Sequence, residues 1–169
     1  MYNSLRFKIK NMMNKEYDDN FQSAKQKEIT LTYAIPVLES ICVDASSLSN
    51  PGPTEYRAVD TQTKKIIFSY KLGEATNNIG EFLAIVHALS LYKKHKKELK
   101  IIYSDSQTAI AWVKQKTCKT KLKRTESNQK LFEIITRAVN WLQTNEYSTK
   151  ILKWNTNAWG EIPADYGRK

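Results

Sequence analysis

The sequence has few cysteines, few histidines and no long apolar run. Two cysteines and two histidines among 169 residues are too few for a disulfide framework or for a zinc site built from Cys and His. No apolar segment approaches the roughly 20 residues that a membrane-spanning helix needs, and the start of the chain lacks the apolar stretch of a secretory signal. We therefore expect a cytoplasmic protein with no membrane partner, in which Cys42 and Cys118 are free thiols.

Negative charge is also in the minority. The chain has 27 lysines and arginines against 17 aspartates and glutamates, and its net charge of +10 favours a polyanionic partner. Residues 1–35 are polar and charged with scattered apolar positions, so we expect a loosely ordered N-terminal extension there. Residues 36–169 are long enough for one compact core, and we expect them to form a single domain in a monomeric protein.

Apolar patterns in residues 36–169 predict an α/β fold. Five segments have the pattern of strands, at residues 40–44, 55–61, 65–70, 100–104 and 150–154. Helical spacing follows the third strand, with Asn77 or Asn78 as the cap and an apolar stripe at Phe82, Ile85, Val86, Leu89 and Tyr92, and it recurs on either side of a basic loop. The first three strands form an antiparallel meander, and helices between the later strands predict parallel additions to it. The prediction is a mixed five-stranded sheet flanked by helices.

Four carboxylates stand in short, distinctive strings of residues. They are Asp44 in ICVDASSLSNPGP, Glu81 in TNNIGEF, Asp105 in IIYSDSQTAI and Asp165 in WGEIPADYGRK. Asp44 and Asp105 end or follow strands, and Glu81 lies in the opening turn of a helix, so the three can meet at one edge of a sheet. Unpaired acids so close together would repel one another, and two divalent ions would relieve the repulsion. Because hard cations prefer oxygen ligands, we expect Mg²⁺, or Mn²⁺ in its place.

Each acid also has a purely structural interpretation, as a helix cap or as a partner in a surface ion pair. Asp105 precedes SQTA and could cap the helix that follows. Glu161, four residues before Asp165, could reach a water molecule near the metal site or could be solvated. The presence of four acids in this order favours the metal site over these alternatives.

The four strings closely resemble type 1 ribonuclease H from about Glu39 to the C-terminus. NPGP after the first Asp, TNN before the Glu and DSQ at the second Asp carry the resemblance beside the acids, and the ending WGEIPADYGRK is similar to that of one bacterial subgroup. The resemblance implies an endonuclease that hydrolyses the RNA strand of RNA/DNA hybrids with two metal ions, leaving 5′-phosphate and 3′-hydroxyl ends. It also implies that Asp44 bridges both ions, that Glu81 and Asp105 hold one, and that Asp165 holds the other.

The resemblance further implies which residues bind the hybrid. Short polar side chains would line its shallow groove, at Ser47, Asn50, Asn77, Asn78 and Gln107. Such groups suit contacts with a 2′-hydroxyl and with base edges, although Asn50 and Asn78 could serve turns or caps as well. The loop from Lys114 to Arg124 has six cations and no acid, and it is either a solvated face or a phosphate-binding surface. We expect phosphate contacts to the DNA strand from Lys116, Lys119, Lys121 and Lys123.

One position departs from the family pattern. Family members often place a histidine ten residues before the last Asp, where this chain has Asn155, so metals and carboxylates would carry the chemistry alone. Two rival functions are a DNA nuclease of the transposase or integrase kind and a hybrid-binding module with weak or no activity. The NPGP, TNN and DSQ strings count against the first, and the presence of all four acids counts against the second.

Overall fold

The structure is a computed structural model that describes residues 35–97 and 100–167. The expected extension at residues 1–35 therefore lies almost entirely outside the described residues, and both its loose order and the domain boundary after it stay predictions. Within the described ranges, no helix combines the length and the apolar character that crossing a bilayer requires.

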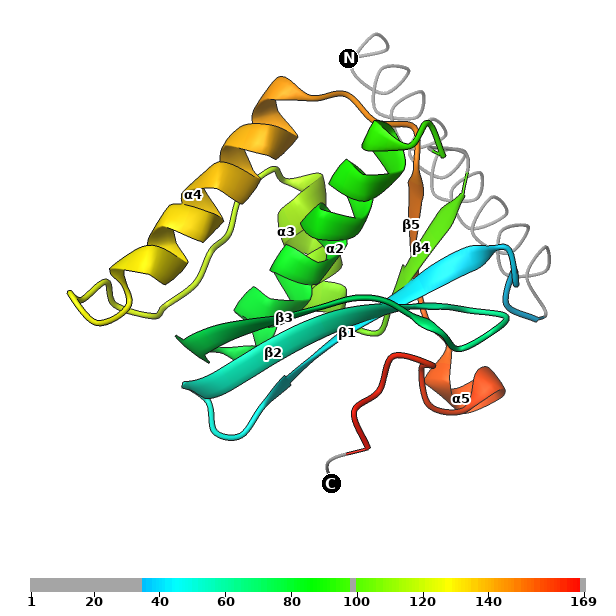
Figure 1. Ribbon diagram of the computed structural model, residues 1–169, viewed down its shortest axis with the longest axis horizontal. Helices are drawn as coiled ribbons and strands as arrows, with labels where there is room; N and C mark the ends of the chain where they lie inside the picture. The colour runs from blue at the N-terminus through cyan, green and yellow to red at the C-terminus, as the bar shows by residue number, and fades with distance from the viewer. Residues whose placement is uncertain (1–34, 98–99, 168–169) are drawn as a thin grey trace, which may run out of the picture. The chain divides into compact units, whose positions relative to one another are not determined.

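A five-stranded sheet forms the centre of the described chain (Figure 1). Its strands are β1 (Ser40–Ser47), β2 (Gly52–Asp60), β3 (Ile66–Ala75), β4 (Ile101–Ser104) and β5 (Lys150–Lys153). They lie in the order β3-β2-β1-β4-β5. The first three strands pair antiparallel, whereas β4 runs parallel to β1 and β5 runs parallel to β4. The predicted mixed sheet, a meander extended by parallel strands, is confirmed.

The meander strands are longer than the sequence predicted. β1 continues past Asp44 to Ser47, and β2 begins at Gly52, before the predicted start at Glu55. Proline has no backbone N–H, which is why sequence reasoning excluded Pro53 from the strand. The structure accommodates this proline as the second residue of β2, at the start of the strand, where few ladder hydrogen bonds are lost.

Four helices flank the sheet within the described chain. They are α2 (Asn77–Lys94), α3 (Gln107–Lys114), α4 (Gln129–Thr144) and the short α5 (Thr156–Trp159). The side chains of Ile41 and Val43 on β1 join the core formed with α2, α3 and α4. On the opposite face of the sheet, the Tyr103 ring packs edge-on against Trp159 of α5. Helices thus lie on both faces, with three of the four on the side of the core (Figure 1).

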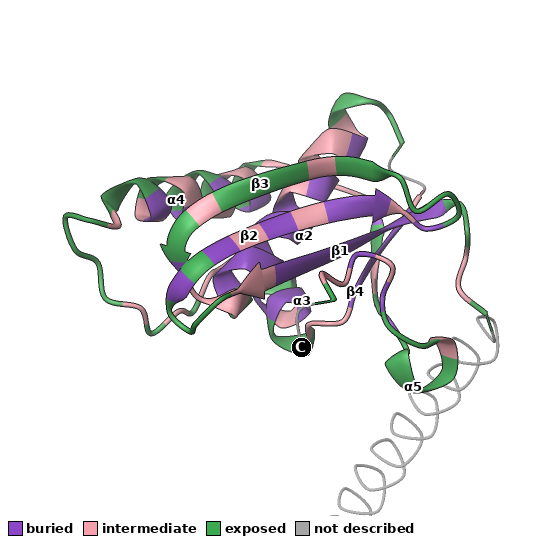
Figure 2. Cartoon of the chain, turned by 60° about the horizontal axis from the view of Figure 1, so that its bottom comes forward, coloured by how far each residue is buried: buried purple, intermediate pink, exposed green. Residues whose placement is uncertain are grey.

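The buried core fixes α2 against the central strand. β1 is buried from Ser40 to Ala45, whereas most of the edge strand β3 is exposed (Figure 2). Phe82, Ile85 and Leu89, which carry the predicted apolar stripe of α2, have no exposed surface. Packing of this stripe against the sheet therefore sets the position of the first turns of α2 relative to β1.

The start of α2 lies very close to β1. A Cβ atom at Gly80 would lie 2.7 Å from the Ala45 Cβ and 3.0 Å from the Thr54 Cγ2, so a glycine is needed for this approach. The N-cap is Thr76, whose hydroxyl accepts a hydrogen bond from the Ile79 N–H. The predicted caps, Asn77 and Asn78, were wrong. Threonine and asparagine both cap well, so residue type alone does not choose among adjacent candidates.

Candidate active site

The site begins where β4 ends and β1 continues. The parallel pairing of these two strands stops at Val43 and Ser104, and the next residue of each segment is an aspartate, Asp44 or Asp105. Asp44 is therefore not the last residue of β1, as the sequence predicted. It is the first residue of β1 that lies beyond the pairing with β4. This register sets the two carboxylates at the same level of the sheet.

Glu81 reaches the same point from α2. It follows Gly80, so the close approach of the helix brings its carboxylate to β1. Its Oε1 accepts a hydrogen bond from the Ala45 N–H at 3.2 Å. Its Oε2 is buried without a hydrogen-bond donor among the described residues, and the carboxyls of Glu81 and Asp44 can bond to each other only when one of them is protonated. A buried carboxylate oxygen of this kind is costly unless a cation binds it.

The three acids form a tight cluster. One carboxylate oxygen from each of Asp44, Glu81 and Asp105 lies within 4.8 Å of the others. Burial raises the pKa of Asp44 to about 6, and the charges of Asp105 and Asp165 add to the rise. Burial and the nearby Asp44 charge raise the pKa of Glu81 well above its usual range, and burial raises the pKa of Asp105. At neutral pH the cluster therefore needs a counter-ion if all three carboxyls are to be ionised without a large cost in free energy.

Asp165 comes from the segment at residues 160–167, which follows α5 and has no regular secondary structure. Its Oδ2 accepts a hydrogen bond from the Gly167 N–H at 3.0 Å. The carbonyls of Ala164 and Asp165 both accept hydrogen bonds from Arg57 of β2. Arg57 lies directly opposite Asp44 in the register of β1 and β2, so the two side chains share one face of the sheet. Asp165 thus reaches the cluster from the face opposite to α2.

All four acids line one cleft of about 420 Å³. The other residues that line it are Ala45, Ser46, Ser47, Asn77, Ser106 and Tyr166. The structure therefore brings the four predicted acids together, and it places three of them close enough to share one ion.

The residues predicted to bind the hybrid groove separate into two groups. Ser47 and Asn77 line the cleft, and the Asn50 Oδ1 accepts a hydrogen bond from the Asn77 N–H at 3.2 Å. Asn78 and Gln107 are exposed near the starts of α2 and α3, outside the set of described residues that line the cleft. The structure thus places two of these five residues in the cleft and connects a third to it.

The four predicted lysines do not line the cleft either, as far as the described residues show. Lys119, Lys121 and Lys123 are exposed, while Cys118 just before them and Leu122 between the last two pack against the core. Residues 118–123 therefore form a basic strap with an apolar inner side and a cationic outer side. The strap keeps its three exposed lysines available to a partner.

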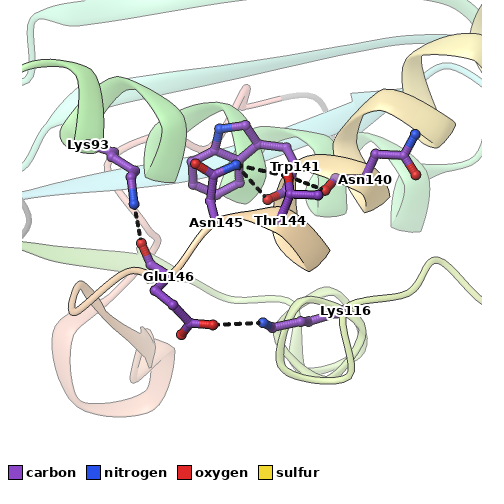
Figure 3. Close-up of polar contacts among 7 residues, drawn as sticks. All are labelled: Lys93, Lys116, Asn140, Trp141, Thr144, Asn145 and Glu146. Carbon is purple, nitrogen blue, oxygen red and sulfur yellow. Dashed lines mark hydrogen bonds and ion pairs between the residues drawn. The ribbon is translucent and has the colours of Figure 1, made fainter.

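Lys116 differs from the lysines of the basic strap because it has an acidic neighbour. Its ammonium lies 3.6 Å from the Glu146 carboxylate, and the Glu146 carbonyl also accepts a hydrogen bond from Lys93 of α2 (Figure 3). Glu146 thus joins the end of α2 to the loop after α3. The sequence could not reveal this pair, because Lys116 and Glu146 are thirty residues apart in the chain.

The structure decides whether Asp105 caps a helix, and it gives Asn155 a structural role. Asp105 is not the cap of α3, since the Ser106 Oγ accepts the hydrogen bond from the Ala109 N–H at 3.2 Å. Asn155, which stands where the family often has histidine, caps α5 through a hydrogen bond from the Ala158 N–H to its Oδ1. Asp105 therefore does not cap a helix, whereas Asn155 is the N-cap of α5.

Sequence reasoning misses Arg57, Ser106 and Tyr166. Ser106 and Tyr166 each follow one of the acids directly, so they could have been added to the predicted cleft on position alone. Arg57 gives a weaker signal, because it is one of several polar residues in its strand. Its position opposite Asp44 becomes visible only with the register of the sheet.

The donor set of the cleft fits a hard divalent cation. It offers four carboxylates, one of them with a buried oxygen that lacks a donor among the described residues. Neither Cys42 nor Cys118 lines the cleft, and carboxylate oxygens are the ligands that Mg²⁺ and Mn²⁺ prefer. The residues present therefore suit the metal that the sequence predicted.

One protein-family model and several solved structures are similar to this chain. The RNase H family model matches residues 39–161. Among solved structures, the N-terminal RNase H domain of Rv2228c from Mycobacterium tuberculosis, as a fusion with maltose-binding protein, is 18% identical, with 69% of this chain and 86% of that chain covered and a TM-score of 0.43. RNase H1 from the halophilic archaeon Halobacterium salinarum is 20% identical, with 70% and 86% covered and a TM-score of 0.44.

A third similar structure is that of LC11-RNase H1, from compost metagenomic material, in complex with an RNA/DNA hybrid. It is 22% identical, with 69% of this chain and 85% of that chain covered and a TM-score of 0.41. The family model itself spans well over half of the 169 residues, from the residue before β1 to the segment after α5. On that match, this chain belongs to the RNase H family.

Proposed function

We propose that this chain is an endonuclease that hydrolyses the RNA strand of RNA/DNA hybrids and leaves 5′-phosphate and 3′-hydroxyl ends. The observation that carries the proposal is the approach of Asp44, Glu81 and Asp105 to within 4.8 Å of one another, in a protein with a net charge of +10. The positive charge attracts a polyanion. A phosphodiester can then approach the clustered carboxylates only with divalent cations between them.

The four acids would hold two Mg²⁺ ions, with Mn²⁺ as a substitute. Asp44 would contact both ions, Glu81 and Asp105 one, and Asp165 the other. When bound, the ions would activate water for attack at phosphorus and stabilise the charge of the leaving oxygen. The chain's own contribution is to fix the carboxylates in advance. The Ala45 N–H holds Glu81 Oε1 and thereby leaves Oε2 for an ion.

Selection of the RNA strand would come from polar groups beside the acids. Ser47 and Asn77 line the cleft, where a hydroxyl and an amide can bond to a 2′-hydroxyl. Asn50 would position Asn77 through the hydrogen bond to its backbone. Asn78 and Gln107, both exposed, would contact the hybrid beside the cleft.

Affinity would come largely from phosphate contacts of the basic strap. Lys119, Lys121 and Lys123 are exposed and would contact the DNA strand. Lys116 would have to leave Glu146 to do the same, so we assign it the smallest part. We also propose that the protein acts as a monomer in the cytoplasm, where a reducing compartment suits the free thiols of Cys42 and Cys118.

A panel of substrates tests the proposal. An RNA/DNA hybrid, a DNA duplex and an RNA duplex of one sequence, each end-labelled, are incubated with the full chain in Mg²⁺, in Mn²⁺ or in EDTA. We expect cleavage of the hybrid's RNA strand alone, with either metal and not in EDTA. Cleavage of the DNA duplex would instead favour a nuclease of the integrase kind. Hybrid binding without cleavage in either metal would favour an inactive binding module.

A further inference from the structure

Arg57 connects the meander to the segment that carries the fourth acid. Its Nε donates a hydrogen bond to the Ala164 carbonyl at 2.8 Å, and its Nη2 donates to the Asp165 carbonyl at 2.5 Å. Its guanidinium carbon lies 4.2 Å from the centre of the Tyr166 ring. One side chain thus contacts three consecutive residues, with Asp165 in the middle.

The two ends of this connection differ in their structural support. Arg57 lies in β2, which pairs with β1 on one side and β3 on the other, and it faces Asp44 across the β1–β2 ladder. Residues 160–167 have no regular secondary structure. Their other described anchors include the Trp154 indole, which donates to the Gly160 carbonyl, and the buried side chains of Ile162 and Ala164. The Asp165 N–H also donates to the Ile162 carbonyl at 2.8 Å, but that bond lies within the segment, whereas the two Arg57 bonds connect its backbone to the sheet.

Arginine suits this task because its guanidinium is planar and presents several donors in a fixed arrangement. Two parallel hydrogen bonds to neighbouring carbonyls restrict both the distance and the orientation of that backbone, and an aromatic ring against the plane adds to the restraint. A lysine could offer only a single charged centre at the end of a flexible stem.

We propose that Arg57 is a positioning residue, which holds the Asp165 backbone so that its carboxylate faces the Asp44, Glu81 and Asp105 cluster. The inference rests on the proposed function, in which Asp165 holds an ion. In this role Arg57 acts through its contacts with Ala164, Asp165 and Tyr166, and not through substrate or metal. Loss of its two hydrogen bonds would allow the Asp165 carboxylate to move away from the cluster, and small displacements of catalytic groups are costly in rate.

The experiment compares Arg57→Met, Arg57→Lys and the control Arg137→Met in the full chain. Arg137 is an exposed arginine of α4, so its exchange matches the change in side chain without contact to residues 160–167 within the described structure. Hydrogen–deuterium exchange of peptides that cover residues 160–167 is the first measurement. We expect faster exchange there in Arg57→Met, a smaller increase in Arg57→Lys and none in Arg137→Met. Unchanged exchange in both Arg57 variants would overturn the inference.

Kinetics with the hybrid separate positioning from general stability. Arg57→Met should lower kcat on the order of tenfold or more with little change in KM, since it misplaces a catalytic acid without removing a phosphate contact. In an Asp165→Asn background the same change should have little further effect, because the group that Arg57 positions is already lost. An equal loss in both backgrounds would contradict the inference. If the unmodified chain failed to cleave any hybrid, the proposed function would fail, while the exchange measurement would still decide the role of Arg57.

Discussion

The Glu81 carboxylate accepts a hydrogen bond from the Ala45 N–H at 3.2 Å, and this contact joins α2 to the central strand at the acidic cluster. The pairing of β4 with β1 ends at Val43, two residues before Ala45. Glu81 of α2 therefore accepts a hydrogen bond from a backbone N–H that β4 does not reach. The contact orients one oxygen of Glu81 and leaves the other buried within the cluster. One contact therefore gives the Ala45 N–H a hydrogen-bond acceptor and also orients the Glu81 carboxylate as a candidate metal ligand.

This contact depends on the close approach at Gly80, and Gly80→Ala tests that dependence. The added methyl group would lie 2.7 Å from the Ala45 Cβ, which is part of a buried strand and cannot move aside cheaply. We expect the free energy of unfolding to fall by about 1 to 3 kcal/mol. We also expect kcat on hybrid to fall, because α2 must shift and carry Glu81 with it. Chemical denaturation and steady-state kinetics measure the two effects.

Ser90→Ala is the control for Gly80→Ala. It is a change of similar size on the same helix, at a residue outside the core cluster. Its effect on kcat should be small. A Gly80→Ala protein with the stability and kcat of the unmodified chain would show that α2 does not need this glycine.

The crowding of the acids should make the metal-free protein less stable as pH rises. The folded-state pKa of Asp44 is about 6, above the value of an unfolded aspartate, so its stabilising contribution is present below about pH 4 and is lost as pH rises through 6. Asp44→Asn removes that charge. In EDTA at pH 8 we expect it to raise the free energy of unfolding by about 1 to 2 kcal/mol, measured by urea denaturation.

The same variant gives a second expectation for metal binding. Mg²⁺ should raise the melting temperature of the unmodified chain at pH 8 more than that of Asp44→Asn, because a ligand that binds the native state stabilises it. Glu133→Gln, which neutralises an exposed acid of α4, serves as the control and should keep the response to Mg²⁺. Equal responses to Mg²⁺ in the unmodified chain and Asp44→Asn would argue against Asp44 as a ligand.

The basic strap should determine how binding depends on salt. Replacement of Lys119, Lys121 and Lys123 by glutamine should raise KM and reduce the salt slope of hybrid binding, by up to about three units if all three contact phosphates. The kcat at saturating hybrid should change little. Binding titrations in EDTA over a range of KCl concentrations provide the slope.

Lys116→Gln is the matched control for the basic strap, since this lysine has Glu146 as its neighbour. It should change the salt slope by well under one unit. A triple variant with an unaltered slope would make the strap a solvated surface and not part of the binding site.

The sequence was sufficient to predict the mixed sheet and the meeting of the four acids in one cleft, and the reason is physical. Strand alternation and helical spacing reflect burial on one face, and the structure buries the predicted stripe of α2 completely at Phe82, Ile85 and Leu89. Asp44 and Asp105 could be placed together because parallel strands bring corresponding positions to one level, which the register of β1 and β4 bears out.

What the sequence could not supply depends on contacts between distant segments. Arg57 meets Ala164 and Asp165 more than a hundred residues away, and Lys116 meets Glu146 across the loop and α4. No local sequence pattern predicts either contact, because the residues that form it are far apart in the chain. The cap of α2 was missed for a different reason, because Thr76 and Asn77 are both suitable residues and only the backbone decides between them.

The most direct test of the central claim compares cleavage and binding in Asp44→Asn and Asp105→Asn. Each change removes a ligand charge from the cluster but no phosphate-binding cation, and Asp60→Asn, at an aspartate whose Oδ1 accepts backbone hydrogen bonds in the turn after β2, is the matched control. With a labelled hybrid in Mg²⁺, we predict no turnover for the two cluster variants and normal turnover for the control, while all three bind hybrid in EDTA like the unmodified chain. Mg²⁺-dependent turnover in either cluster variant would contradict the assignment of these acids as the metal-binding catalytic site.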